Sequence, residues 1–257
     1  MSDSIPFKNG TFCWVELATT DIDEARKFYG QLFGLETKDE SMPEWTYWMF
    51  MKGDKATAGL TNLKPEAQEM GAPSHWLNYV GCTDTEATFN KAVELGAEAL
   101  MPIQDVPEAG KMGLLKDPEG AVFALWQPFK ENEQVHRNFD GAFCWQEKGT
   151  NNMQGSKDFY KDVFGWNGET KGAQPMPYTT FYLEGNMEAG MYEIQEHMKD
   201  VPPHWMVYFM TDDIDTLMGK VEGLGGQIIL PITPVPEVGR ISVIMDPQGA
   251  VFGVVGE

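Results

Sequence analysis

The stretch FCWVELATTDIDEARKFYGQLFGLE, residues 12–36, decides the fold, because it returns as FCWQEKGTNNMQGSKDFYKDVFGWN at residues 143–167. Both copies open with Phe-Cys-Trp and carry Phe-Tyr and Phe-Gly at the same offsets, so that each residue lies 131 positions after its counterpart. Each copy begins with a β-rich run and ends with apolar residues at helical spacing. A repeat of this length indicates a duplicated domain rather than a solenoid.

The remainder of each half repeats as well, with a shift of 129. His75-Trp76 returns as His204-Trp205, and the turn Asp117-Pro-Glu-Gly returns as Asp246-Pro-Gln-Gly. These turns combine an Asp acceptor, the fixed φ of proline and a permissive glycine. A fainter repeat inside the first half relates residues 21–36 to residues 83–98. We therefore predict four modules, each with the order strand–helix–strand–strand–strand.

Local signals mark the ends of the helices in these modules. Asp21 followed by Glu24 resembles a capping box at the start of the first helix, and Gly34 can end that helix in a left-handed conformation. Thr83 and Glu86 predict the same kind of start for the second helix. The helix boundaries therefore follow from local chemistry as well as from the repeat.

Composition predicts a globular protein with an acidic surface. With 257 residues, 42% of them apolar, the chain can form two domains, each with a core of its own. Its formal charge of −20 argues against nucleic acid or an anionic membrane as the main partner. Residues 1–10 lack the features of a signal peptide. The three cysteines form no C-x-x-C pair, which is typical of a reducing compartment, so we expect a cytoplasmic monomer or homodimer.

Four such modules, the D-P-x-G turn before a last strand and the T-x-D…F-Y…F-G helix resemble the vicinal oxygen chelate (VOC) superfamily. This superfamily includes glyoxalase I, extradiol dioxygenases, fosfomycin resistance enzymes and bleomycin-binding proteins. The chain is most similar to the two-domain, glyoxalase/bleomycin resistance/hydroxylase-like members, whose first strand carries C-W-x-[ED]. The resemblance implies an α+β fold in which four βαβββ modules form two paired VOC domains, each with a curled mixed sheet around a cleft and helices outside.

The repeat also sets the expected domain boundaries. We expect an N-terminal domain at residues 1–129, with modules at about 10–64 and 74–128. A C-terminal domain at residues 140–257 then has modules at about 140–196 and 203–256. The polar residues 130–139 between the two domains form the expected linker.

Catalytic members of the family hold a divalent metal ion through His, Gln or Glu at fixed strand positions. In this sequence the positions that can be aligned carry side chains that do not ligate a hard cation. They are, first half before second, Trp14 and Trp145, Leu77 and Met206, Ala124 and Gly253, and Leu60 and Met191. The resemblance therefore predicts no cofactor, and a shifted divalent metal site with one His and one Glu per cleft is the alternative.

Strand parity separates the residues that face a helix from those that face the cleft. Val15 and Leu17 have the helix parity, whereas Trp14 and Glu16 face the cleft by this count. The residues expected to line the clefts are Trp14, Glu16, His75, Leu77, Tyr79, Lys111, Ala124 and Trp126 in the first and Trp145, Glu147, His204, Met206, Tyr208 and Arg240 in the second. The tryptophans expected to lie in the core under the helices are Trp76 and Trp205.

Several of these residues have two interpretations. A carboxylate in an apolar cleft can act as acid, base or anchor, which makes Glu16 and Glu147 the candidate catalytic residues, but each can instead hold its strand in place. Lys111 and Arg240 can meet an anionic ligand or pair with surface carboxylates. The histidines that open two strands can transfer protons or bond to the backbone. The aromatic side chains can stack on a ligand or pack in the core.

Three functions follow as alternatives. The first is a metal-free protein that binds a small, partly aromatic or apolar organic molecule in one or both clefts. The second is an enzyme of lyase, isomerase, dioxygenase or hydroxylase type that uses a cleft glutamate or a non-standard metal site. The third is an interaction protein whose clefts are filled by side chains. Gln146 and Lys148 replace Val15 and Leu17 in the second half, so its first strand is expected to pack less tightly.

Overall fold

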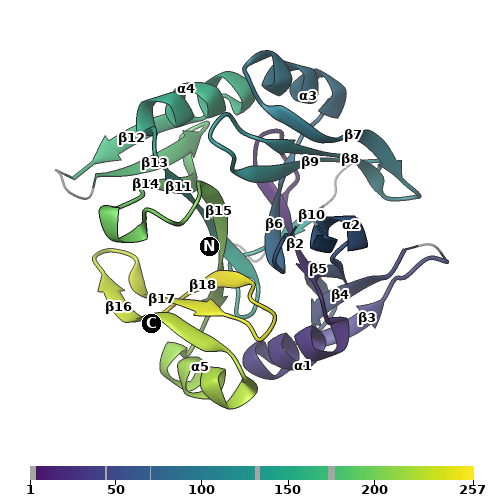
Figure 1. Ribbon diagram of the computed structural model, residues 1–257, viewed down its shortest axis with the longest axis vertical. Helices are drawn as coiled ribbons and strands as arrows, with labels where there is room; N and C mark the ends of the chain where they lie inside the picture. The colour runs from purple at the N-terminus through teal and green to yellow at the C-terminus, as the bar shows by residue number, and fades with distance from the viewer. Residues whose placement is uncertain (1–3, 44, 70, 131–133, 173–176) are drawn as a thin grey trace.

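The computed structural model describes residues 4–43, 45–69, 71–130, 134–172 and 177–257. Two eight-stranded mixed sheets are flanked by helices, and the same βαβββ order occurs in each quarter of the chain (Figure 1). This architecture confirms the predicted α+β fold of four modules in two pairs. Within the described ranges, no helix is long and apolar enough to cross a membrane.

The first sheet is built from modules one and two. Module one comprises β2 (Phe12–Thr19), α1 (Ile22–Phe33), β3 (Glu36–Asp39), β4 (Tyr47–Lys52) and β5 (Lys55–Asn62), and α2 (Pro65–Glu69) leads to the next module. Module two comprises β6 (His75–Gly81), α3 (Thr85–Glu94), β7 (Glu98–Val106), β8 (Gly110–Lys116) and β9 (Val122–Pro128). The strand order is β3-β4-β5-β2-β6-β9-β8-β7, so the two modules meet at β2 and β6.

The second sheet repeats this arrangement with modules three and four. Module three comprises β11 (Phe143–Thr150), α4 (Met153–Phe164), β12 (Asn167–Lys171), β13 (Tyr178–Leu183) and β14 (Asn186–Glu193), followed by the 3-10 turn η1 (Glu196–Met198). Module four comprises β15 (His204–Thr211), α5 (Ile214–Val221), η2 (Glu222–Leu224), β16 (Gln227–Val235), β17 (Gly239–Met245) and β18 (Val251–Gly256). The strand order is β12-β13-β14-β11-β15-β18-β17-β16.

A short strand pair joins the beginnings of the two halves. Strand β1 (Ser4–Pro6) pairs antiparallel with β10 (Gln134–His136). The Oγ of Ser4 lies 2.7 Å from Nδ1 of His136. Of the predicted linker 130–139, residues 131–133 lie outside the described part, and β10 occupies the next three positions.

The two larger hydrophobic cores each join residues of both halves, whereas a third, smaller cluster lies within the second half. Helix α1 packs against α5, and α3 packs against α4, as Figure 1 shows at the bottom and top of the molecule. One core joins Phe28 and Tyr29 of module one to Phe252 of module four. The other joins Phe123 of module two to Tyr160 of module three. We call these contacts the first seam (modules one and four) and the second seam (modules two and three). The expectation of a separate core in each domain is therefore wrong.

The helix ends follow the predicted chemistry with one exception. Asp21 accepts a hydrogen bond from the backbone N–H of Glu24 at 3.0 Å, and Gly34 ends α1 with φ 65°. Helix α3 is capped by Asp84, whose Oδ1 accepts from the N–H of Ala87 at 2.9 Å, and not by Thr83. A longer carboxylate side chain one residue later reaches the free N–H group, so the predicted boundary shifts by one residue.

Candidate functional site

A glutamate lies at the centre of each sheet. Glu16 on β2 is opposite Gly59 on β5 and Leu77 on β6. Glu147 on β11 is opposite the residues at the equivalent positions of the second sheet, Gly190 on β14 and Met206 on β15. Both glutamates have the strand parity opposite to that of the residues that pack under the helices, whose side chains are buried. We call the faces that carry Glu16 and Glu147 the first and second cleft.

Two tyrosine hydroxyls hold each glutamate. Tyr178 donates to Oε1 of Glu147 at 2.8 Å, and Tyr208 donates to Oε2 at 2.9 Å. In the first cleft, the hydroxyls of Tyr47 and Tyr79 make the equivalent hydrogen bonds to Glu16. Each carboxyl group is therefore oriented by two donors from different strands.

A tryptophan extends this chain of hydrogen bonds. The indole N–H of Trp14 donates to Oη of Tyr47 at 3.0 Å, and that of Trp145 donates to Oη of Tyr178 at 3.2 Å. The order is the same in both halves: the indole donates to a tyrosine hydroxyl, which donates to the carboxyl group, and a second tyrosine also bonds to that group. The structure thus brings the predicted Trp14, Glu16 and Tyr79, and their counterparts in the second half, into one contact.

Two glycines make this chain possible. A Cβ atom at Gly59 would collide with the hydroxyl of Tyr47, and one at Gly190 would collide with the hydroxyl of Tyr178. The sequence analysis did not single out Tyr47 or either glycine. The signal was present, because each of the three has a counterpart 131 positions away.

Burial changes the protonation of the glutamates. Desolvation raises the pKa of Glu16 from 4.5 to about 7, although the hydrogen bonds from Tyr79 and Tyr47 oppose the rise. The pKa of Glu147 is also raised by desolvation, against the bonds from Tyr178 and Tyr208. A carboxyl group with a pKa near 7 can accept or donate a proton at neutral pH, so Glu16 has the chemistry of a general acid or base.

The residues present do not fit a metal centre of the family type. Trp14, Leu77 and Ala124 stand at the aligned ligand positions of the first cleft and offer no hard ligand atom. In the second cleft a Cβ atom at Gly253 would overlap the ring of Tyr208, so no ligating side chain has room there. Among the residues described, no group of three or more His, Cys, Asp or Glu side chains is placed to hold a metal ion.

The two strand-start histidines bond to the backbone. Nδ1 of His75 lies 2.8 Å from the carbonyl oxygen of Pro73, and Nδ1 of His204 lies 2.8 Å from that of Pro202. His204 has a further contact, because its Nε2 lies 3.3 Å from Oη of Tyr192 on β14. Tyr192 was not predicted as a site residue. Its counterpart in the first half is Thr61, so the repeat gave no signal for it.

The two predicted cations pair with the helices. Lys111 lies 3.1 Å from a carboxylate oxygen of Glu86 at the start of α3. Arg240 lies 2.8 Å from a carboxylate oxygen of Asp215 at the start of α5. The structure therefore directs both side chains toward exposed helix carboxylates and does not join them to the glutamate chains.

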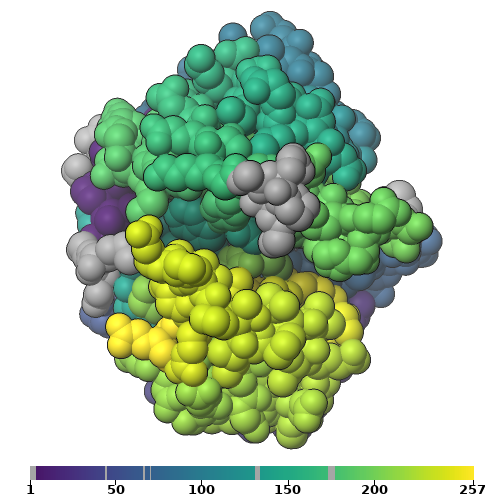
Figure 2. All heavy atoms as spheres, turned by 90° about the vertical axis from the view of Figure 1, so that its left-hand side faces the viewer, coloured from purple at the N-terminus to yellow at the C-terminus, as the bar shows by residue number. Residues whose placement is uncertain are grey.

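The walls beside the glutamates are mainly apolar. In the second cleft a cluster of apolar side chains adjoins Glu147 and comprises Cys144, Trp145, Met206, Tyr208, Met210, Ile241, Val243 and Val255. Figure 2 shows this side of the molecule hollowed between the green atoms of module three and the yellow atoms of module four. In the first cleft Ala124 is opposite Tyr79, and Trp126 is opposite Met112. A carboxyl group among apolar and aromatic walls is typical of a small-molecule site.

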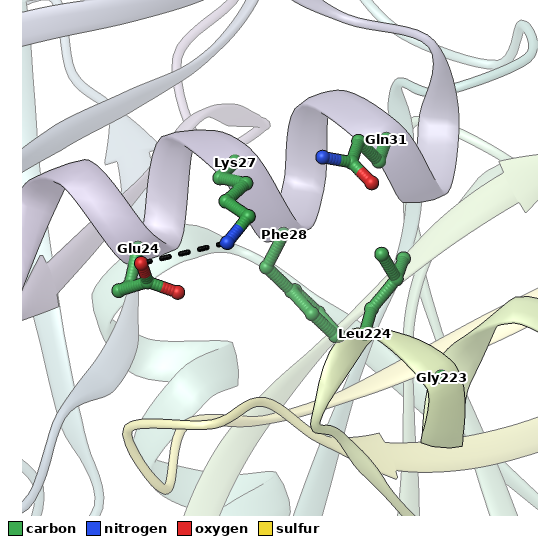
Figure 3. A pocket seen from close by; sticks show the side chains of 6 residues that line it. All are labelled: Glu24, Lys27, Phe28, Gln31, Gly223 and Leu224. Atoms are coloured by element: carbon green, nitrogen blue, oxygen red, sulfur yellow. Dashed lines mark ion pairs between the residues drawn. The ribbon is translucent and has the colours of Figure 1, made fainter.

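Two small hollows lie outside the clefts. One of about 160 Å³ lies on the first seam, between α1 and η2, and is lined by Glu24, Lys27, Phe28, Gln31, Gly223 and Leu224 (Figure 3). The other, of about 130 Å³, lies on the second seam, between the turn at Asp117 and the first residues of α4. Neither hollow includes a glutamate of the two clefts.

Comparison with known proteins agrees with the resemblance seen in the sequence. The model of the Glyoxalase/Bleomycin resistance protein/Dioxygenase superfamily matches residues 11–125 and 147–254. "Putative glyoxylase CFP32" of Mycobacterium bovis is 34% identical over 250 residues, which are 96% of this chain and 95% of that protein. "Anthracycline biosynthesis protein DnrV" of Streptomyces peucetius is 27% identical over 260 residues, which are 97% of this chain and 94% of that protein.

The fold also matches a solved structure. The Mn(II)-bound glyoxalase from Novosphingobium aromaticivorans superposes with a TM-score of 0.67 at 13% identity. The match covers 98% of this chain and 83% of that protein. At this identity the likeness shows a common fold, whereas the residues of the two clefts have to be judged by their own chemistry.

Proposed function

Because the chain belongs to the glyoxalase/bleomycin resistance protein/dioxygenase superfamily, we propose that it binds a small organic molecule in one or both clefts without a metal ion. The observation that carries this proposal is the chain of Trp, Tyr, Glu and Tyr side chains that both halves build around a central carboxyl group. We also propose a cytoplasmic location, with which the buried, unbridged Cys13, Cys82 and Cys144 agree.

The chemistry of the walls supports a ligand that is partly aromatic or apolar. Met206 lies opposite Glu147 on β15, and Trp145 is two residues before it on the same face of β11, so both offer apolar surface near this carboxyl group. The carboxyl oxygens have lone pairs beyond those used by the tyrosines, so a ligand donor group can bond to them. One oriented polar group among apolar walls gives a ligand a fixed orientation.

A thermal-shift and titration screen of small aromatic molecules, in buffer that contains a chelator, tests the binding function. We expect hits that raise Tm with EDTA present, and we expect Trp14→Ala and Trp145→Ala to weaken binding at their respective clefts. Trp48→Ala is the matched control, because Trp48 stacks on Arg26 of α1 at 3.5 Å and lies outside the hydrogen-bond chains. A panel without any hit, or a stoichiometric divalent metal in untagged protein, would contradict the proposal.

An acid–base enzyme is a second candidate, favoured by the pKa of about 7 for Glu16. In this version the carboxylate of Glu16 takes a proton from the carbon next to a carbonyl group of the ligand and returns it to the neighbouring carbon, so 2-hydroxycarbonyl compounds are suitable first probes. We expect Glu16→Gln to abolish turnover and to leave the fold intact, with Tyr47→Phe as the milder matched change. Turnover that survives both Glu16→Gln and Glu147→Gln would rule this version out.

A further inference from the structure

The two clefts differ at one corner. In the second cleft, Oη of Tyr192 lies 3.3 Å from Nε2 of His204. In the first cleft His75 stands at the equivalent place, but Thr61 replaces the tyrosine. The hydroxyl of Thr61 donates to the carbonyl oxygen of Thr46 at 2.9 Å. The second cleft therefore has a phenol beside its histidine, where the first has a short side chain bonded to the backbone.

Gly149 fits this corner. A Cβ atom at Gly149 would lie 2.8 Å from Cε1 of His204 and 3.1 Å from Oη of Tyr192. Such distances are too short for an undisturbed contact, so a side chain here would displace both rings. The first half has Ala18 at the equivalent position, where no tyrosine has to fit. Gly149, Tyr192 and His204 are therefore matched to one another.

The hydrogen bonds of this corner fix the direction in which it donates. The carbonyl oxygen of Pro202 can only accept, so Nδ1 of His204 carries the proton and Nε2 presents a lone pair. Burial lowers the pKa of His204, so the ring is neutral at pH 7. Burial raises the pKa of Tyr192, so its hydroxyl stays protonated and is the donor.

Building on the proposed function, we propose that the second cleft selects a hydroxylated aromatic molecule, whose hydroxyl group bridges Tyr192 and His204. The present separation of 3.3 Å is long for an O–H···N bond, so it can be exchanged for two shorter bonds. The ligand hydroxyl donates to Nε2 of His204 and accepts from Oη of Tyr192. The aromatic ring then lies toward Met206, the member of the apolar cluster that is two residues from His204 on the same face of β15.

A hydroxyl group is the chemistry that matches this corner. It offers one donor and two acceptor positions, which the lone pair of Nε2 and the released O–H of Tyr192 both need. A methyl ether can accept from Tyr192 but cannot donate to His204. The structure thus predicts discrimination between a phenol and its methyl ether, and it predicts this at the second cleft only.

Isothermal titration of the full chain with 2-naphthol and with 2-methoxynaphthalene tests this selectivity. We expect 2-naphthol to bind about five- to tenfold more tightly, the usual effect of one hydrogen bond. His204→Ala and Tyr192→Thr, the latter copying the first half, should reduce the ratio of the two affinities to about one. His75→Ala is the matched control and should leave the ratio unchanged. The ¹⁵N shift of the His204 Nε2 resonance should move with 2-naphthol and not with the ether.

A reciprocal pair of substitutions in the first cleft tests whether the glycine, the tyrosine and the histidine together are sufficient for the selectivity. Ala18→Gly combined with Thr61→Tyr rebuilds the corner in the first cleft, and we expect a second 2-naphthol site of similar preference. Equal affinities for the two probes in the wild-type protein would overturn the selectivity and leave the proposed binding function standing. A ratio that survives in His204→Ala, or one that disappears in His75→Ala, would overturn it too. Failure of both probes to bind would count against the binding function itself.

Discussion

The two seams have the same backbone and opposite chemistry. On the first seam Leu17 of β2 and Ala25 of α1 are fully buried, and Gln248 belongs to the turn of module four. On the second seam Lys148, Glu119 and Ser156 occupy the three equivalent positions. Lys148 is as fully buried as Leu17. The comparison shows that this helix–sheet interface accepts either an apolar contact or a complete ionic network.

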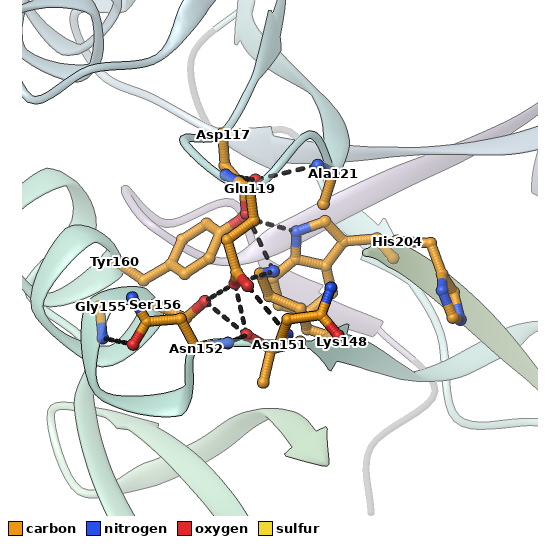
Figure 4. Close-up of polar contacts among 12 residues, drawn as sticks. Asp117, Glu119, Ala121, Lys148, Asn151, Asn152, Gly155, Ser156, Tyr160 and His204 are labelled. Carbon is orange, nitrogen blue, oxygen red and sulfur yellow. Dashed lines mark hydrogen bonds and ion pairs between the residues drawn. The ribbon is translucent and has the colours of Figure 1, made fainter. Parts of the chain in front are cut away.

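The network of the second seam is fully connected (Figure 4). Nζ of Lys148 lies 3.1 Å from Oδ2 of Asp117 and 3.1 Å from Oε2 of Glu119. Glu119 also accepts hydrogen bonds from the hydroxyls of Thr150 and Ser156 and from the backbone N–H of Asn151. At Lys148 the charge is therefore fully paired, so the replacement of Leu17 by a lysine leaves no unpaired ammonium group. At Gln146, the other replaced position of this strand, both atoms of the buried amide lack a hydrogen-bond partner among the described residues, so the expectation of looser packing stays a prediction there.

A shared element remains on both seams. The hydroxyl of Tyr29 donates to Asp246 at 2.9 Å and accepts from the indole of Trp76 at 3.1 Å. On the second seam, the hydroxyl of Tyr160 donates to Asp117 at 2.8 Å and accepts from the indole of Trp205 at 2.8 Å. The helix tyrosine of one half thus bonds to the D-P-x-G turn of the other half. Trp76 and Trp205 face the helices, as strand parity predicts.

The charges of Lys148 and Glu119 favour one way of pairing the two halves of the chain over another. If a first half docked on a second copy of itself, Glu119 would face Leu17 and lose the buried ammonium group of Lys148. A buried carboxylate without its partner costs several kcal/mol, on the order of 3 to 5. The network therefore favours the pairing of the first half with the second half over the pairing of identical halves.

The largest expected effect is at Lys148. Lys148→Met removes the ammonium group and leaves two carboxylates beside each other on the second seam. We expect the free energy of unfolding to fall by about 3 to 5 kcal/mol, measured by urea denaturation. Leu17→Met, the equivalent position of the first seam, should cost less than about 1.5 kcal/mol. Equal losses in the two variants would show that the seams do not differ energetically.

A second variant should recover most of that loss. Lys148→Leu with Glu119→Gln gives the second seam the side chains that the first seam has at two of the three positions, while Ser156 remains in the place of Ala25. We expect the double variant to regain about 3 kcal/mol relative to Lys148→Leu alone, because an apolar replacement of a complete ion pair is often neutral. A double-mutant cycle on the full chain measures this coupling. If the two single losses simply added, the carboxylate of Glu119 would not be the group that needs Lys148.

The clefts allow a comparison by pH. The folded-state pKa of Glu16 is raised by burial from 4.5 to about 7, so the neutral form favours folding. The stability that this raised pKa contributes is fully present below pH 4.5 and is lost as the pH rises through 7. Glutamine does not titrate, so only the wild type loses stability as the pH rises. The free energy of unfolding of Glu16→Gln minus that of the wild type should therefore increase by about 2 to 3 kcal/mol between pH 4.5 and pH 8.

Glu147→Gln should change in the same direction, because burial also raises the pKa of Glu147. Urea denaturation of the wild type and both variants at several pH values checks the sign. The opposite sign for either variant would mean that the tyrosine hydrogen bonds outweigh desolvation at that glutamate. Glu119 behaves differently: burial opposes the shift, but hydrogen bonds from Ser156 and Thr150 and the charge of Lys148 lower its pKa.

The fold was predictable because each of its signals is local. Alternation along the strands, the helix cap at Asp21 and the turns at Asp117 and Asp246 act within a few residues, and the repeat multiplies them. The pairing of modules one and two follows from the family resemblance. The contacts of the seams are different, because Tyr29 and Asp246 are 217 residues apart. The repeat makes the two turns equivalent in sequence, so it cannot say which turn each helix meets.

The residues of the site could be predicted from the sequence only where their positions along a single strand decide which way they face. Parity along β2 predicts that Trp14 and Glu16 face the same way, and in the structure both belong to one hydrogen-bond chain. Tyr47 joins this chain from β4, two strands away, so its role depends on the register of three strands and on the space at Gly59. Tyr192 has no counterpart in the first half, so the repeat could not reveal it.

The smallest expected effect compares the two helix tyrosines. Tyr29→Phe leaves Oδ2 of Asp246 and the indole N–H of Trp76 without the hydroxyl that both bond to. Tyr160→Phe removes the same bonds on the second seam, but there Oδ2 of Asp117 keeps Lys148 at 3.1 Å. We therefore expect Tyr29→Phe to cost about 1 kcal/mol more than Tyr160→Phe. In the Lys148→Leu, Glu119→Gln background this difference should vanish, because the second seam then lacks its extra cation. A difference that persists in that background would place its origin in ring packing rather than in the carboxylates.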